Sequence, residues 1–286
     1  MRYPIYQVDA FTDQLFGGNP AAVMPLETEL PDQTLQALAA ENNLAETAFI
    51  TRLPEDNEAD FSIRWFTPTI EVPLCGHATL ATAWVLFNKM GWSEDRVRFQ
   101  SKSGLLGVSR GEIESEVESE IESKSKSEED VDWLTMDFPN LPFEERPTPA
   151  VIKAALSGAP DRAYFVPNDT NYMVEMPDEA SVIAADPDSQ ILKTLGGQGL
   201  IITAPGQHCD FVSRYFAPGA GIAEDPVTGS IHSVLVPYWA EKLGKTRFDA
   251  RQLSRRGGRL RCELKGDRVA IAGQAVLYME GTVYLP

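Results

Sequence analysis

The chain has 286 residues, of which 43% are hydrophobic and 23% charged, as is ordinary for a globular protein with a substantial core. Its formal net charge of −17 argues against nucleic acid and against anionic membrane surfaces as partners. No stretch is apolar over the thickness of a bilayer, and the first residues lack the pattern of a signal peptide. The three cysteines, Cys75, Cys209 and Cys262, lack metal-site spacing, so we expect free thiols in the cytoplasm.

In chain order, residues 1–140 predict an N-terminal lobe built mainly of strands. Strands are expected where apolar residues alternate, and helices where they recur every three or four positions. The expected strands cover residues 3–10, 21–25, 44–50, 61–68, 97–108 (two strands) and 133–138, and the expected helices residues 31–42 and 75–91. Residues 112–130 hold nine acids and two lysines, a charge of −7, and we expect an exposed acidic insertion without chemistry.

Residues 141–286 predict a C-terminal lobe, and the C-terminal strand is also a candidate to complete the first lobe. Residues 142–149 are rich in proline and are expected to link the two lobes. Further strands are expected at residues 163–176 (two strands), 200–203, 209–216, 253–264, 269–272 and 275–279, and further helices at 149–156, 180–195 and 228–244.

Residues 75–91 form the stretch around which the rest of the chain is organised. From Ala78 to Phe87 the sequence is apolar or small on every side apart from two threonines, which indicates a buried helix. Gly76 and His77 open this helix, so their free backbone N–H groups, at the positive end of the helix dipole, form a candidate anion site. At such a position the pKa of the Cys75 thiol is expected to fall.

The same stretch occurs a second time, at residues 228–244. Gly76 aligns with Gly229 at an offset of 153, and just upstream residues 60–68 align with residues 210–218 at an offset of 150. Two matching blocks in the same order, at a period far too long for a solenoid, indicate one α/β unit that has been duplicated. If the two lobes face each other, both helix N-termini would surround one bound carboxylate.

Glu46 is the one carboxylate inside the strand-like run LAETAFI at residues 44–50. A carboxyl group that is buried without a partner titrates nearer neutrality, which suits a general acid or base. The alternative is a side chain that points outward from a half-buried strand, since alternation places it opposite Thr47 and Phe49. Spacing alone leaves both interpretations open.

The second helix is preceded by Asp225 and by a short turn that contains Gly229 and Ser230. In one interpretation, the acid and the serine at this place serve only as caps for the free N–H groups of the helix. The alternative is substrate binding, because donors aimed at developing negative charge are a strong catalytic device. His232 lies inside an apolar helix and is expected to be a core residue. The three histidines are too few and too badly spaced for a zinc motif. No motif for a nucleotide, flavin or pyridoxal phosphate is present.

Several blocks in combination resemble the PhzF-like (phenazine biosynthesis) family, which shares its fold with diaminopimelate epimerase. They span nearly the whole chain and read VDAFTDQLFGGNPAAV, LAETAFI, RWFTPTIEVPLCGHATLATAWVL, YFAPGAGIAEDPVTGSIHSVLVPYW, SRRGGRL and VAIAGQAVLYMEG. The resemblance implies an α+β fold with two pseudo-symmetric lobes, each a mixed β-barrel around a central buried helix. Exposed sheet edges in such lobes favour a homodimer.

The resemblance also implies a reaction. It points to an isomerase, without metal or cofactor, that moves a proton on a small carboxylic acid, similar to trans-2,3-dihydro-3-hydroxyanthranilate isomerase. The implied site residues are, for catalysis, Glu46, His77 and Asp225 and, for substrate binding, Cys75, Gly76, Gly229 and Ser230.

Two other functions stay open at this point. An amino-acid epimerase or racemase would use Cys75, but the second cysteine of such enzymes falls within residues 225–227, which hold no cysteine. Retained activity of a Cys75→Ala variant would exclude this function. A non-catalytic member of the family would instead bind a small acid without any exchange of protons with solvent.

Overall fold

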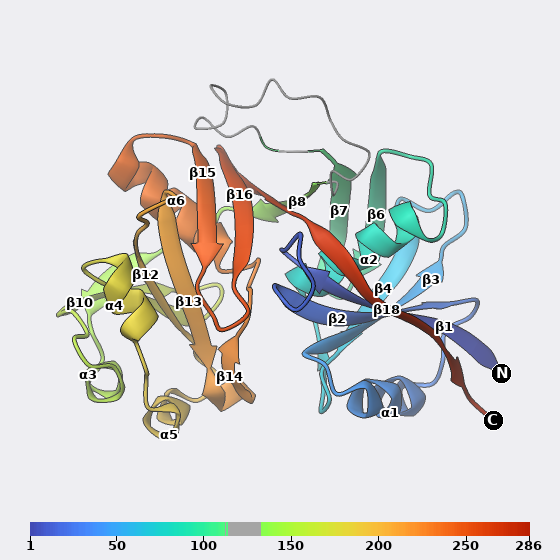
Figure 1. Cartoon of the computed structure of the whole chain (residues 1–286), viewed down its shortest axis with the longest axis horizontal. Coiled ribbons are helices and arrows are strands. Elements are labelled where there is room, and N and C mark those ends of the chain that lie inside the picture. The colour runs from blue at the N-terminus through green and yellow to red at the C-terminus, as the bar shows by residue number, and fades with distance from the viewer. Residues whose placement is uncertain (112, 114–132) are drawn as a thin grey trace. The chain divides into compact units, whose positions relative to one another are not determined.

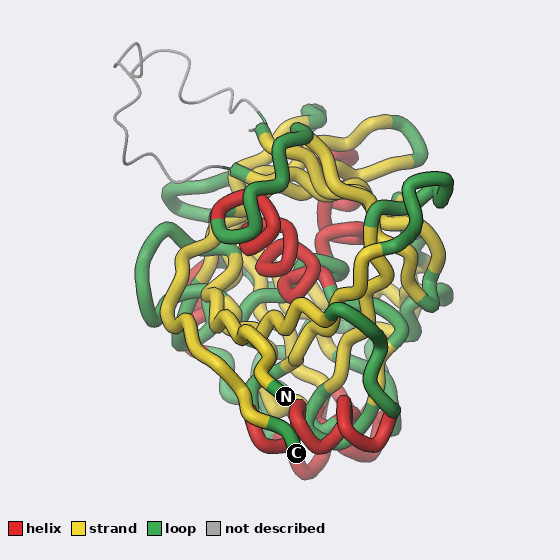
Figure 2. Tube along the Cα trace, turned by 90° about the vertical axis from the view of Figure 1, so that its right-hand side faces the viewer, coloured by secondary structure: helices red, strands yellow, loops and turns green. Residues whose placement is uncertain are grey.

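The computed structural model describes residues 1–111, 113 and 133–286. The acidic insertion expected at residues 112–130 therefore lies outside the described part of the chain, apart from Ile113. The chain divides into two compact units, and strands are the main component of the described chain (Figure 2). Among the described residues, unit 1 holds 1–111, 113, 133–137 and 271–286, and unit 2 holds 138–270. The last strand, the candidate to complete the first lobe, lies in unit 1.

Unit 1 is built from strands that come from both ends of the chain (Figure 1). Its strands are β1 (Arg2–Ala10), β2 (Asn19–Leu26), β3 (Glu46–Arg52), β4 (Phe61–Phe66), β5 (Glu71–Val72), β6 (Arg96–Ser101), β7 (Gly104–Arg110) and β18 (Ala275–Tyr284), and its helices are α1 (Asp32–Asn42) and α2 (Gly76–Asn88). The strands β8 (Leu134–Pro139) and β17 (Arg268–Gly273) carry the chain across the division between the units.

The sheet of unit 1 mixes parallel and antiparallel pairs. β1 lies between β18 and β2 and is antiparallel to both. β2 runs parallel to β3, with Ala21 opposite Glu46, and β3 is antiparallel to β4. β4 is parallel to β6, which is antiparallel to β7. The two chain ends meet in this sheet (Figure 2), where the ammonium group of Met1 donates to the carbonyl of Leu285 at 2.5 Å.

The helix α2 is buried on all sides, as the sequence predicts. Every residue of it except Trp84 and Asn88 is buried, and it contacts β1, β2, β3, β7 and β18. The two threonines fit this environment because each hydroxyl donates to a carbonyl one turn earlier, Thr79 to Cys75 at 2.6 Å and Thr82 to Ala78 at 2.7 Å. At 13 residues it cannot reach across a bilayer, and no other described helix meets the requirements of a membrane span.

A second core of unit 1 forms between the sheet and α1. The predicted apolar face of this helix, Leu35, Leu38 and Ala39, is buried. The buried members of this cluster are Ile5, Ala22, Met24, Leu26, Leu35, Leu38, Ala39, Phe49 and Phe66.

Unit 2 repeats the strand order of unit 1. Its strands are β9 (Glu144–Pro147), β10 (Arg162–Val166), β11 (Asn171–Glu175), β12 (Leu200–Pro205), β13 (Phe211–Ala217), β14 (Ile222–Asp225), β15 (Arg247–Gln252) and β16 (Gly258–Lys265). β9, β10 and β11 are antiparallel neighbours, and β11 is parallel to β12. β12 is antiparallel to β13, β13 is parallel to β15, and β15 is antiparallel to β16. In unit 1 the same succession of pairs runs from β18 through β7.

The repeated blocks also make equivalent contacts in the two units. Arg64 of β4 holds Glu71 through two hydrogen bonds of 2.8 and 2.9 Å, and its partner in the alignment, Arg214 of β13, holds Glu224 through two of 2.6 and 3.1 Å. Such paired bonds between a guanidinium and a carboxylate are among the stronger polar contacts in proteins. The sequence repeat therefore corresponds to a repeated piece of structure, in which each arginine supports the segment after its strand.

The helices of unit 2 are α3 (Ala150–Ala155), α4 (Glu179–Ala184), α5 (Ser189–Leu192) and α6 (His232–Leu243), with 3₁₀ turns η2 (Lys193–Leu195) and η3 (Pro218–Ala220). α6 tolerates Pro237 in its interior because the carbonyl of Ser233, which proline cannot bond, accepts from the N–H of Leu141 at 3.0 Å. Trp239 stacks on Phe211 of β13, and its Nε1 donates to the hydroxyl of Thr203 at 3.0 Å.

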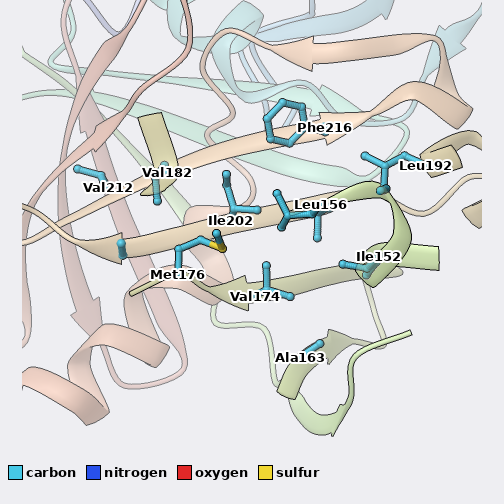
Figure 3. Packing of buried hydrophobic residues seen from close by; sticks show 13 residues of the cluster. Ile152, Leu156, Ala163, Val174, Met176, Val182, Leu192, Ile202, Val212 and Phe216 are labelled. Carbon is cyan, nitrogen blue, oxygen red and sulfur yellow. The ribbon is translucent and has the colours of Figure 1, made fainter. Parts of the chain in front are cut away.

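One core cluster of unit 2 joins its sheet to α3, α4 and α5 (Figure 3). Its buried members are Ile152, Ala155, Leu156, Ala163, Val174, Met176, Val182, Leu192, Leu200, Ile202, Ala204, Val212 and Phe216. The apolar residues of the short helices α3, α4 and α5 pack against one face of the sheet in this cluster.

Three expectations about the elements of unit 2 are wrong. Residues 142–149 are no simple linker, since β9 pairs with β10 there. The strand expected at 253–264 begins only at Gly258, and β15, which pairs with it, was not predicted. The second central helix begins at His232, because Gly229 and Ser230 form a turn before it.

Candidate active site

Glu46 and His77 form a buried pair in unit 1. Glu46 is the first residue of β3, His77 is the second residue of α2, and Oε2 of Glu46 lies 3.1 Å from Nε2 of His77. Only 8% of Glu46 and 5% of His77 is exposed. The outward-pointing interpretation of Glu46 is therefore wrong, because the first five residues of β3 are buried in succession and alternation brings none of them to solvent.

Two further side chains hold the other ring nitrogen of His77. Nδ2 of Asn19 lies 3.2 Å and Sγ of Cys75 lies 3.5 Å from Nδ1 of His77. Asn19 is completely buried and is the first residue of β2. These contacts orient the imidazole so that Nε2 faces the carboxylate of Glu46.

The charges in this cluster follow from burial and proximity. Burial lowers the pKa of His77, but its contacts with Cys75 and Glu46 outweigh burial and raise this pKa well above 6.5. Burial, helped by Glu46, raises the pKa of Cys75 to about 11, so this thiol keeps its proton at neutral pH. Glu46 is then the negative partner of His77. The expected fall of the Cys75 pKa is wrong, because desolvation exceeds the effect of the helix N-terminus.

We expect the wild-type His77 to stay charged above pH 6.5. In a Glu46→Gln variant it should lose its proton at lower pH, because burial is then opposed by one group fewer. Proton binding by the pair stabilises the fold fully below pH 6.5, and this contribution is lost as pH rises through the raised pKa. An NMR titration of the imidazole signals, assigned with His77→Asn, measures both values. Burial lowers the pKa of His232 to about 4, which gives an internal comparison. A wild-type His77 that titrates at or below 6.5 would contradict the pairing.

Asp225 lies in a second polar cluster, in unit 2. It is the last residue of β14, and its Oδ2 accepts a hydrogen bond from the hydroxyl of Thr228. The amide of Gln252, completely buried at the end of β15, donates to the carbonyl of Asp225 at 2.8 Å and to the hydroxyl of Thr228 at 3.2 Å. Its Oε1 accepts from the N–H of Thr228 at 2.8 Å. One buried side chain thus fixes the loop that carries the Asp225 carboxylate.

The turn before α6 satisfies the helix start through backbone groups and not through a side-chain cap. Within the described part of the chain no side chain caps α6, and the carbonyls of Gly229 and Ser230 accept from the N–H groups of His232 and Ser233, both at 3.0 Å. The interpretation of Asp225 as a helix cap is wrong, because its carboxylate binds Thr228 and the helix begins at His232. His232 itself is completely buried, as expected of a core residue.

The predicted site residues fall into two groups, one in each unit. Unit 1 brings together Glu46, Cys75, Gly76 and His77, and unit 2 brings together Asp225, Gly229 and Ser230. Among the described residues, Glu46, Cys75 and His77 also form a set of possible metal ligands whose ligand atoms all lie within 4.8 Å of one another.

Three residues of these clusters were missed from the sequence. Asn19 looked like part of a tight Gly-Gly-Asn-Pro turn, although it opens β2 and contacts His77. Thr228 and Gln252 act through contacts that no local pattern shows, because Gln252 lies in a strand that was not predicted.

Comparisons with known proteins place the chain in a family. A family model described as phenazine biosynthesis-like protein (PhzC-PhzF) matches residues 8–281. An uncharacterized isomerase of Pseudomonas aeruginosa is 47% identical over 285 residues and all of both chains. The human phenazine biosynthesis-like domain-containing protein is 41% identical over 306 residues, 99% of each chain. The crystal structure of a PhzF family protein from Enterococcus faecalis, 43% identical, covers all of both chains with a TM-score of 0.86.

A more distant likeness concerns the fold alone. A probable proline racemase from Agrobacterium radiobacter is 11% identical and covers 99% of this chain and 93% of its own, with a TM-score of 0.61. The mixed, sheet-dominated α+β fold is thus shared with this probable racemase. The names of relatives that are 40–47% identical support an isomerase. On the evidence of the family model and of relatives matched over their full length, the chain belongs to the phenazine biosynthesis-like (PhzC-PhzF) family.

Proposed function

We propose that the chain is a cofactor-independent isomerase that moves a proton on a small carboxylic acid, similar to trans-2,3-dihydro-3-hydroxyanthranilate isomerase. The observation that carries this proposal is the buried pair of Glu46 and His77 at the start of a buried helix. A positioned carboxylate can take a proton from an activated carbon and return it to another. The isomerase name of the Pseudomonas relative supports the reaction class.

Glu46 is the proton carrier in this proposal, and His77 balances its charge. Before the reaction the carboxylate and the imidazolium neutralise each other in a site that water does not solvate. When Glu46 takes a proton from the substrate, the imidazolium is left to stabilise the negative charge that develops there. Return of the proton to a second carbon restores the original pair.

The helix start supplies the binding groups for the substrate carboxylate. The N–H groups of Gly76 and His77 lie in the first turn of α2, where the helix itself offers no acceptor. In unit 2 we assign the equivalent role to Gly229 and Ser230. Asp225, whose carboxylate is fixed by the loop around it, assists the movement of protons.

Movement of one proton within one substrate needs a single carrier, whereas an epimerase needs one on each face of the carbon. Cys75, the candidate for a second carrier in unit 1, keeps its proton at neutral pH because burial raises its pKa to about 11. We therefore assign Cys75 to the wall of the binding site. A proton shift from one carbon to another fits these groups better than inversion of a single carbon.

We also propose that each unit is a lobe in the form of a mixed β-barrel around its central helix, and that two chains form a homodimer. The contacts of α2 with β1, β2, β3, β7 and β18 support the barrel for unit 1. For unit 2, the repeated order of strand pairs supports it.

We expect the protein to catalyse solvent deuterium exchange into one member of a panel of small cyclic and acyclic carboxylic acids. The purified protein is incubated with the panel in D2O, beside the Glu46→Gln variant, and the acids are read by mass spectrometry. Exchange by the wild type alone would support the proposal, because only proton transfer to or from carbon leaves deuterium on the product.

Two outcomes would contradict the proposal. Exchange that persists in the Glu46→Gln variant would mean that another group carries the proton. If the Cys75→Ala variant then loses the exchange, Cys75 is that group and the epimerase function is favoured. Tight binding of an acid without exchange by the wild type would favour a non-catalytic binding protein.

A further inference from the structure

A small cavity lies in unit 1, away from the candidate active site. It forms where β2 and β3 end and β4 begins, beside the C-terminal end of α2, and its volume is about 150 Å³. Arg52, which lines it, is the last residue of β3, and Glu46 is the first, so the strand separates the two by about 20 Å. The residues that line the cavity are Pro25, Leu26, Ile50, Arg52, Phe61, Leu86, Met90 and Trp92.

The floor of the cavity is apolar. Leu26, Ile50, Phe61 and Leu86 form it, and each of them is at most 7% exposed. An apolar cavity of about 150 Å³ in another protein stays dry and admits one benzene molecule. Pockets for drug-sized ligands are larger, at about 300–1,000 Å³. The cavity therefore has room for a single six-membered ring and not for a nucleotide or a large cofactor.

Arg52 is the one charged residue in the lining of this cavity. Its guanidinium carbon lies 5.4 Å from the centre of the Phe61 ring and 4.9 Å from that of the Trp92 ring. Contacts with ring faces hold a guanidinium in place and leave its N–H groups to bind an acceptor. Among the described residues no carboxylate pairs with Arg52, although the chain has 42 acidic residues and only 25 lysines and arginines. The rim of the cavity thus offers an oriented cation without an anionic partner.

We propose that this cavity binds a small aromatic carboxylic acid, with the ring on the apolar floor and the carboxylate on Arg52. A guanidinium can hold a carboxylate through two parallel hydrogen bonds, and burial of the ring removes apolar surface from water. Phe61 and Trp92 meet edge to face, with ring centres 5.5 Å apart, an arrangement that a third aromatic ring can extend. Met90, which is 45% exposed, has an unbranched side chain that can adapt to the ring.

Both parts of the ligand are needed for recognition at this site. A neutral ring leaves the guanidinium of Arg52 unpaired, and a carboxylate without a ring leaves the apolar floor uncovered. The site is also independent of the proposed reaction. The N–H groups assigned to the substrate carboxylate belong to Gly76 and His77 at the start of α2, whereas Leu86 lies near its end. The proposed function and this binding site can therefore fail separately.

Benzoate is the probe for this site, titrated into the full-length protein labelled with ¹⁵N. The indole N–H of Trp92 donates to the carbonyl of Arg96 at 3.0 Å, so its NMR signal, assigned with Trp92→Phe, reports on the cavity and not on the candidate active site. We expect this signal to shift with a Kd below about 1 mM, an affinity within reach of a ligand of this size. Benzamide, which lacks the charge, and acetate, which lacks the ring, should each bind at least ~10-fold more weakly.

Arg52→Gln removes the charge from an exposed side chain and should weaken benzoate binding at least ~10-fold while the affinity for benzamide is unchanged. Arg2→Gln is the matched control, because Arg2 is an exposed arginine of the same unit that lies over the ring of Tyr284 at 5.6 Å. It should bind benzoate as the wild type does. A Trp92 signal that does not move at millimolar benzoate, equal affinities for benzoate and benzamide, or unchanged benzoate binding in Arg52→Gln would each overturn the proposal.

Discussion

Replacement of Glu46 by glutamine is expected to lower turnover by about 10²–10⁴-fold while substrate affinity stays within a few-fold of the wild type. The amide has nearly the shape of the carboxylate but cannot accept and return a proton at neutral pH. Because the N–H groups of Gly76 and His77 are untouched, the substrate carboxylate keeps its binding site. Steady-state kinetics on the acid identified by deuterium exchange, together with a direct binding assay, separate the two effects.

Glu41→Gln is the matched control for this variant. Glu41 lies on α1 in the same unit and is exposed, so the same chemical change should leave turnover unaltered. A Glu46→Gln enzyme that keeps turnover within a few-fold of the wild type would end the assignment of Glu46 as the proton carrier.

The largest loss of stability is expected when a buried side chain of α2, the central helix of unit 1, is shortened. Leu80 is completely buried on α2, and its Cδ2 lies so close to Gly273 that a Cβ there would meet it at 3.0 Å. Leu80→Ala keeps a good helix former but leaves a cavity, so we expect the free energy of unfolding to fall by about 2–5 kcal/mol. Urea denaturation followed by circular dichroism measures this change.

Leu243→Ala makes the same substitution at the end of α6, where the side chain is 44% exposed. It should alter the free energy of unfolding by less than about 0.5 kcal/mol. Equal effects at the two positions would contradict the description of α2 as a helix packed on every side.

Those parts of the fold that depend on local pattern could be predicted. The all-apolar run of α2 and the apolar face of α1 follow from periodicity, and both lie where the sequence places them. The internal repeat was also visible, because residues 60–68 match residues 210–218. Arg64 and Arg214 of these blocks each hold a glutamate in the structure. Elements that depend on distant pairing were not predictable. β15 has charged residues in half of its six positions and is a strand because β13 and β16 lie beside it.

The candidate site shows the same division. Glu46 and His77 were named from the sequence, since a carboxylate in an apolar strand and a Gly-His helix start are local features. Glu46 is buried because other parts of the chain cover both faces of β3. The sequence of one strand does not show whether both of its faces are covered. The sign of the Cys75 pKa shift depended on the balance of desolvation and helix dipole, which spacing leaves open. Gln252 was invisible because its partners come from another segment of the chain.

The pairing of β1 with β18 has a consequence for the order of events on the ribosome. The sheet of unit 1 begins at Arg2, yet one neighbour of its first strand is made only from residues 275–284. Residues 138–270 of unit 2 form one continuous stretch that is synthesised before that strand. Domains usually complete their folding in the order of synthesis, the N-terminal one first. Here the part of the protein that is translated first must wait, with an open sheet edge beside β1, until residues 275–284 have been synthesised and released.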